Sequence, residues 1–183
     1  MNFQRSAVEQ GEQFAQNCLL TLRLVGFDVA ETKFRTGDMG VEIDAIANNS
    51  QGLAFPFEFK GSFLGSRPGM LRSDTVKKAI ATAYLFSLDE AAHTMAPLIV
   101  LTSHRPISGN IANWLARIDR AIILDVLSLT DDRKQLAAYA AMTEADIKRI
   151  IIGGHQAVEI EKRRNGYYDC LKKPKLFEEM NHA

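Results

Sequence analysis

The sequence predicts an α/β fold in which a mixed central sheet is flanked by helices. Three observations lead to this class. An amphipathic helical stretch comes first, and three strand-like segments joined by short links follow it. After another helical stretch, two continuous apolar segments enclose a third one. Short links allow antiparallel pairing of the first three strands, whereas two buried strands separated by a helix are typical of a parallel βαβ unit.

Composition agrees with this class. The 183 residues are 46% hydrophobic and 24% charged, which excludes collagen-like and wholly disordered chains and permits a packed core. Lys and Arg together number 22, as do Asp and Glu, so the formal net charge is zero. A polyanionic partner would therefore have to meet a local basic surface.

The two cysteines, Cys18 and Cys170, lie far apart in the sequence and have no Cys or His neighbour at metal-ligand spacing. A disulfide scaffold and a structural zinc site are therefore not expected. Residues 1–13 lack the apolar segment of a leader, and every apolar run is shorter than a bilayer requires. We expect a cytoplasmic protein that does not enter a membrane.

The first element is a helix predicted over residues 6–25. Phe14, Cys18 and Leu22 recur there at helical spacing, and a glycine follows the last apolar position. A short strand is expected over residues 27–32. A turn-rich link then leads to the second strand.

The second strand is expected over residues 41–47. Strict alternation would point Val41, Ile43 and Ala45 to one face and Glu42 and Asp44 to the other.

The third strand, expected over residues 53–60, should form a hairpin with the second. Its phenylalanines at alternate positions predict a core face, which leaves Glu58 and Lys60 on the opposite face. Pro56 cannot donate a hydrogen bond, so we expect a bulge or an unpaired position there and regular pairing only from Phe57 onward.

The rest of the chain reads as alternating helices and strands. The expected elements are a helix over 74–87, a strand over 97–102, a helix over 108–117 and a strand over 121–126. Trp114 is expected in the core of the crossover. From residue 131 the pattern is helical and basic, with Gly153 and Gly154 as an interruption. We therefore divide the chain into a core over 1–130 and a helical basic extension over 131–183, packed on or next to that core.

Asp44, Glu58 and Lys60 form the pattern that carries chemistry. Glu58 and Lys60 are two residues apart on one strand and so share a face, and hairpin pairing should bring Asp44 to the same face. Two carboxylates can hold a hard divalent cation, above all Mg²⁺, which favours phosphodiester hydrolysis beside a protein ammonium. The structural alternative is a solvated strand face with a cross-strand salt bridge.

In this arrangement the chain resembles the PD-(D/E)xK nuclease superfamily, which has a restriction endonuclease-like core of a helix, an antiparallel β-meander and a βαβ crossover. The resemblance runs from about Ala7 to Val126 and depends on the segment 40–46 and on Phe57-Glu58-Phe59-Lys60. It is closest to the branch of Holliday junction resolvases and related restriction-type enzymes. Ile43 stands where the superfamily has a proline before its aspartate.

The resemblance implies roles for individual residues. Asp44, Glu58 and the backbone carbonyl of Phe59 would bind the metal, and Lys60 would orient or activate the attacking water. A helix acid would complete the catalytic set. That acid would be Glu12 or, as the second choice, Glu9, and Glu42 is a candidate for an additional acid.

Basic residues are concentrated in two stretches. One follows the third strand and the other lies near the C-terminus, where two tyrosines are interleaved. The residues expected to contact DNA are Arg67, Arg72, Lys77, Lys78, Lys162, Arg163 and Arg164. A solvated helix face is the equally weighted alternative for Lys162 to Arg164.

The sequence therefore predicts a metal-dependent endonuclease that hydrolyses DNA to 5′-phosphate and 3′-hydroxyl ends, restriction-type or junction-resolving. Mg²⁺ is the expected cofactor, with Mn²⁺ able to substitute, and a homodimer would let two sites reach both strands. One alternative is a DNA-binding or assembly subunit that keeps the fold without cutting. Another is a small-molecule hydrolase or a protein-interaction domain that uses the βαβ half.

Overall fold

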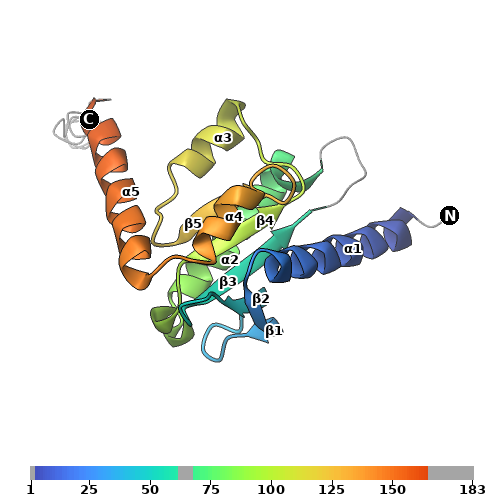
Figure 1. The fold of residues 1–183 in the computed structure, drawn as a ribbon. Helices are drawn as coiled ribbons and strands as arrows, with labels where there is room; N and C mark the ends of the chain where they lie inside the picture. Colours follow the sequence, from blue (N-terminus) through green and yellow to red (C-terminus); the bar gives the residue numbers. More distant parts are fainter. Residues whose placement is uncertain (1–2, 62–67, 165–183) are drawn as a thin grey trace, which may run out of the picture.

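The computed structural model describes residues 3–61 and 68–164, with side chains described over 8–61 and 68–155. A five-stranded sheet forms the centre, and helices cover both of its faces (Figure 1). Within the described residues no helix is both long enough and apolar enough to cross a bilayer.

The elements follow one another in the predicted order, with boundaries that differ by a few residues. The helices are α1 (Phe3–Leu24), η1 (Gly69–Leu71), α2 (Ser73–Ser87), η2 (Glu90–Thr94), α3 (Gly109–Ala116), α4 (Arg133–Tyr139) and α5 (Glu144–Arg164). The strands are β1 (Asp28–Arg35), β2 (Glu42–Asn48), β3 (Ala54–Lys60), β4 (Leu98–Thr102) and β5 (Ile123–Ser128).

The sheet order is β1-β2-β3-β4-β5. The first three strands pair antiparallel, and β3, β4 and β5 pair parallel. The predicted α/β class with a mixed sheet flanked by helices is confirmed. This topology makes β3 the strand at which antiparallel pairing changes to parallel pairing.

Each sheet face has its own apolar cluster. On one face α1 and α4 pack against Phe55, Phe57 and their neighbours, and Phe27 meets both rings edge to face. On the other face α2 packs against the apolar residues of β4, and α3 contributes partly buried side chains. The alternating phenylalanines of β3 all face α1, as their spacing predicted.

Strand β2 departs from strict alternation at Asp44. Ile43 belongs to the cluster under α2, whereas Ala45 belongs to the cluster under α1, so the expectation that both point the same way is wrong. The register with β3 is part of the reason. Pairing of β2 with β3 ends at Ala45, opposite Phe57, so from Asp44 back to Glu42 only β1 pairs with β2, and Lys33 of β1 has a positive φ of 54° beside this break.

The expectation of a bulge at Pro56 is also wrong for the β2 side of β3. Pro56 lies in regular register opposite Ile46. Parallel pairing with β4 begins one residue later, at Phe57 opposite Ile99, so the missing amide falls at the start of that ladder.

The residues beyond 130 begin inside the core. The Tyr139 side chain on α4 is buried against Phe55, and its hydroxyl donates to Asp125 on β5 over 3.0 Å. On α5, Ile147 is buried in the same cluster. The packing of α4 is therefore continuous with that of the sheet.

Two further expectations fail in the α3 to α5 region. Trp114 is 40% exposed on α3, because Ile111 and Leu115 are the residues of that short helix that face the sheet. Helix α5 runs through Gly153 and Gly154 without interruption. A Cβ on Gly154 would lie 2.5 Å from Cγ of Arg120, so glycine at this position allows a close approach.

The two adjacent glycines yield a matched prediction. Gly153→Ala should stabilise the protein by about 0.5–1 kcal/mol, because alanine loses less backbone freedom in a helix and nothing lies within 4 Å of the added methyl. Gly154→Ala should give no gain or a loss, because its methyl would collide with Arg120. Urea unfolding of both variants tests this, and equal gains would contradict the packing of α5 on Arg120.

Candidate functional site

Glu58 and Lys60 lie at the carboxyl end of β3 and share a face, as their spacing requires. Their side chains form an ion pair between Nζ and Oε1. The Glu58 side chain is 6% exposed and that of Lys60 is 23% exposed. The buried member of the pair is thus the acid, and the ammonium is the part that solvent can reach.

Asp44 reaches this pair from β2, at the position where β2 and β3 separate. Its Oδ2 accepts the backbone N–H of Phe59 over 2.6 Å. The Asp44 carboxyl lies close enough to that of Glu58 to raise its pKa. The break in alternation at Asp44 makes this approach possible, since its carboxylate takes the position that a backbone acceptor would fill in a longer ladder.

The electrostatics of the pair centre on Glu58. Burial is the largest cause that raises its pKa from 4.5 to about 7, and the Asp44 carboxyl raises it further. Lys60 opposes this by favouring the ionised form. One ammonium therefore does not fully compensate two adjacent carboxyl groups, and the site favours an additional positive charge.

Helix α1 closes the site from the side of the first apolar cluster. Cys18 is fully buried, and its pKa is raised chiefly by burial and also by the charge of Asp44. Phe14 packs against the residue that follows Lys60: a Cβ on Gly61 would lie 2.4 Å from the Phe14 ring. A side chain at position 61 would push α1 away from the end of β3.

Thr102 supports the end of β3 from the neighbouring strand. It is the register partner of Lys60 and is fully buried. Its hydroxyl donates to the Lys60 carbonyl over 2.7 Å and accepts the Met70 N–H over 3.1 Å. Thr102 is not among the site residues predicted from the sequence. The available signal was its place as the first polar residue after the apolar run of a strand parallel to β3.

The other predicted acids do not join the group. Glu9 and Glu12 are exposed on α1, and Glu42 is exposed at the start of β2, opposite Arg35 on β1. The described residues contain no group of three Asp, Glu, His or Cys side chains that could hold a metal ion. A metal here would have two carboxylates, from Asp44 and Glu58, and backbone oxygen as its protein ligands.

The predicted DNA contacts are only partly described. Arg72 precedes α2, where it forms an exposed ion pair with Asp74, and Lys77 and Lys78 are exposed on the first turns of that helix. The remaining predicted contacts, Arg67 and the side chains of Lys162, Arg163 and Arg164, lie outside the described residues.

Comparison with known proteins adds no assignment: no family model, no curated protein and no solved structure matches the chain.

The raised pKa of Glu58 predicts a pH-dependent stability in the presence of a chelator. Between about pH 4.5 and pH 7 the folded protein holds a proton that the unfolded chain releases, so the free energy of unfolding falls as the pH rises. The loss attributable to Glu58 should be on the order of 3 kcal/mol or less. Urea unfolding at several pH values should show this slope flattened in Glu58→Gln.

Glu31→Gln, an exposed substitution on β1, serves as the control for that measurement. A pH dependence that is the same in wild type and in Glu58→Gln would show that the Glu58 proton affinity is the same in the folded and unfolded chains.

Proposed function

We propose that the protein is a metal-dependent endonuclease that cuts DNA phosphodiester bonds, with the restriction endonuclease-like fold of the PD-(D/E)xK superfamily. The observations that carry the proposal are the Asp44 carboxylate bonded to the amide of Phe59, the residue after Glu58, and Lys60 paired to the buried Glu58 at the solvent side. The order of a helix, three antiparallel strands and a parallel crossover supports the fold assignment.

The residues fit a divalent cation. Two carboxyl groups lie close enough to interact, and the buried one pairs with a single ammonium. Mg²⁺ commonly uses one or two protein carboxylates and keeps several waters, so Asp44, Glu58 and the Phe59 carbonyl would be a sufficient ligand set. When bound, the ion would supply stabilisation of negative charge on the phosphodiester and a lowered pKa of water.

The protein's own groups would orient the attacking water and position the metal ligands. Lys60 places a positive charge at the accessible side of the acid pair, where it would orient the attacking water. Asp44 joins β2 to β3 at this point through its bond to the Phe59 amide, and the Phe59 carbonyl would be the backbone ligand of the set. The products would carry 5′-phosphate and 3′-hydroxyl ends.

DNA is the proposed partner because exposed basic residues follow the site along the chain. Lys77 and Lys78 on α2 would contact backbone phosphates without reading sequence. A homodimer would present two such sites to the two strands. The second candidate is a non-cutting DNA-binding or assembly subunit with the same fold, which the metal-suited acid pair disfavours.

Lys60→Ala should lower the rate of DNA nicking by at least about a hundredfold while Mn²⁺ binding persists, because it removes the charge beside the attacking water but no metal ligand. Supercoiled and branched DNA with Mg²⁺ or Mn²⁺ are the substrates. Lys134→Ala, an exposed lysine on α4, is the matched control. Equal nicking by Lys60→Ala and wild type would contradict the assignment.

Asp44→Asn and Glu58→Gln should each weaken Mn²⁺ binding measured by calorimetry, because each removes one of two charged ligands. Metal binding with no cleavage of any DNA form would favour the non-cutting alternative. Unchanged Mn²⁺ affinity in both variants would contradict the proposed metal site itself.

Replacing Lys77 and Lys78 together by alanine should weaken DNA binding across sequences. The slope of log affinity against log salt should become shallower by about 2, as expected for the loss of two phosphate contacts. Fluorescence anisotropy at several salt concentrations provides the measurement. An unchanged slope would show that α2 does not face the DNA.

A further inference from the structure

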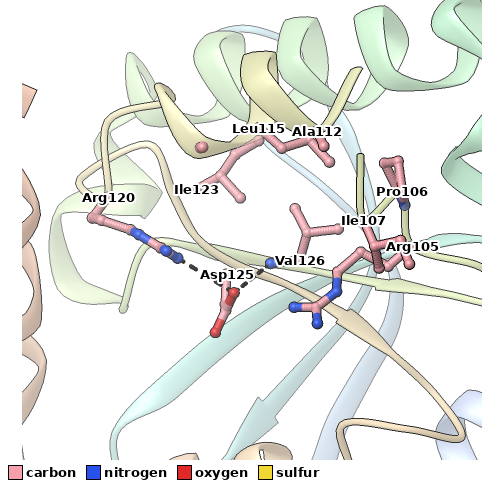
Figure 2. Close-up of a pocket in the computed structure, with 10 residues that line it drawn as sticks. Arg105, Pro106, Ile107, Ala112, Leu115, Arg120, Ile123, Asp125 and Val126 are labelled. Carbon is pink, nitrogen blue, oxygen red and sulfur yellow. Dashed lines mark hydrogen bonds and ion pairs between the residues drawn. The ribbon is translucent and has the colours of Figure 1, made fainter. Parts of the chain in front are cut away.

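A second concave site lies between α3 and β5. It is a cavity of about 380 Å³ with a mostly apolar wall, to which Leu115 of α3 and Ile123 and Val126 of β5 contribute. Arg105 and Arg120 border the cavity from opposite ends, with Asp125 between them (Figure 2). Nothing in the metal-site proposal uses these residues.

The two arginines carry unused hydrogen-bond donors. Arg120 uses one terminal nitrogen, which donates to the Leu124 carbonyl and to Asp125. Arg105 makes a single long ion pair, 3.5 Å to Asp132, and its side chain is 40% exposed. Within the described part of the chain, neither guanidinium has a partner for its other N–H groups. Each can therefore donate to an anionic ligand.

Asp125, in contrast, has a hydrogen-bond partner at each of its carboxylate oxygens. One carboxylate oxygen accepts the Val126 N–H over 2.8 Å and faces Arg120, and the other accepts the Tyr139 hydroxyl. The cavity thus offers apolar surface and spare guanidinium donors. A ligand with a flat apolar body and an attached anion fits this chemistry.

The neighbouring sheet edge is closed to a peptide strand. β5 is an outermost strand, and its outward groups are already bonded by side chains: the Leu124 carbonyl by Arg120, the Val126 amide by Asp125 and the Ser128 amide by Asp132. A peptide added as a sixth strand would have to break these bonds. The occupant is therefore not an extended peptide.

The cavity is near the acid pair. Glu58, Val100 and Val126 are register partners across β3, β4 and β5, so two strand spacings, about 10 Å, separate the first from the last. Arg105 follows Thr102, the partner of Lys60, by three residues, so the Arg105 end of the cavity lies at the same carboxyl edge of the parallel strands as Lys60. About three base steps of B-DNA cover the same distance.

We propose that this cavity binds one nucleotide of the DNA strand, two or three positions from the phosphodiester held at the Asp44 and Glu58 site. The base packs on Leu115, Ile123 and Val126, and its phosphate meets Arg105 and Arg120. This inference rests on the proposed function. Because the base must leave its stack to enter, DNA with unpaired nucleotides beside the cut is the preferred substrate over continuous duplex.

The test measures binding with Lys60→Ala protein, so that cleavage does not interfere. The probe is a single-stranded oligonucleotide containing 2-aminopurine, compared with its duplex. The single strand should bind at least about tenfold tighter than the duplex, and the 2-aminopurine fluorescence should change when that base enters the cavity. Ala112→Phe, which fills the cavity, and Arg105→Ala, which removes a phosphate contact, should each abolish most of that difference.

Two matched substitutions serve as controls. Ala138→Phe on α4 adds the same bulk at an exposed position, and Arg149→Ala on α5 removes an exposed arginine, and both should bind as the parent does. Because Arg105 is exposed, its alanine variant keeps the test valid should Ala112→Phe fail to fold. Parental binding by folded Ala112→Phe and by Arg105→Ala would overturn the cavity proposal.

The outcomes separate this inference from the nuclease assignment. Loss of single-strand preference in the two variants, in a protein whose wild type cuts no DNA, would support the cavity and contradict the nuclease. Cleavage of DNA by the wild type, together with an unchanged single-strand preference in the two variants, would support the nuclease and contradict the cavity proposal. Tight binding of a free deoxynucleoside monophosphate, with no preference for single strands, would show an effector site and overturn the DNA-strand assignment.

Discussion

The bond from the Phe59 amide to the Asp44 carboxylate is the interaction on which the site depends. It forms where β2 and β3 cease to pair, at Ala45 opposite Phe57. A longer ladder would have satisfied the same amide with a backbone carbonyl and turned Asp44 away from Glu58. The fold thus gives up ladder hydrogen bonds to bring a second carboxyl group to the buried one.

Placing the Asp44 and Glu58 carboxyl groups together disfavours the ionised form of Glu58 unless a cation lies beside them. Burial and Asp44 both raise the pKa of Glu58, and Lys60 only partly offsets them. The surrounding contacts hold this end of β3 in place: Thr102 fixes the carbonyl of Lys60, and the Phe14 ring lies against Gly61. A buried carboxyl group with a shifted pKa, held in place by rigid neighbours, is typical of sites that bind a ligand or an ion.

Much of the fold could be predicted because its periodicities are strong. The three core-facing phenylalanines of β3 and the apolar runs of β4 and β5 define strands independently of their neighbours. The sequence-based predictions were wrong where packing against a neighbouring element determines the local structure. Pro56 keeps its register because β4 begins pairing one residue later, and α5 tolerates its paired glycines because Arg120 packs against one of them.

Glu58 and Lys60 share a face because they are two residues apart on a strand, and the sequence by itself determined this. It also determined the order of the elements, through hydrophobic period and turn residues. Only the tertiary structure decided how Asp44 reaches Glu58, which residue supports Lys60 from β4 and where a cavity borders β5. These features depend on where ladders begin and end between segments distant in sequence, and local patterns carry no information about that.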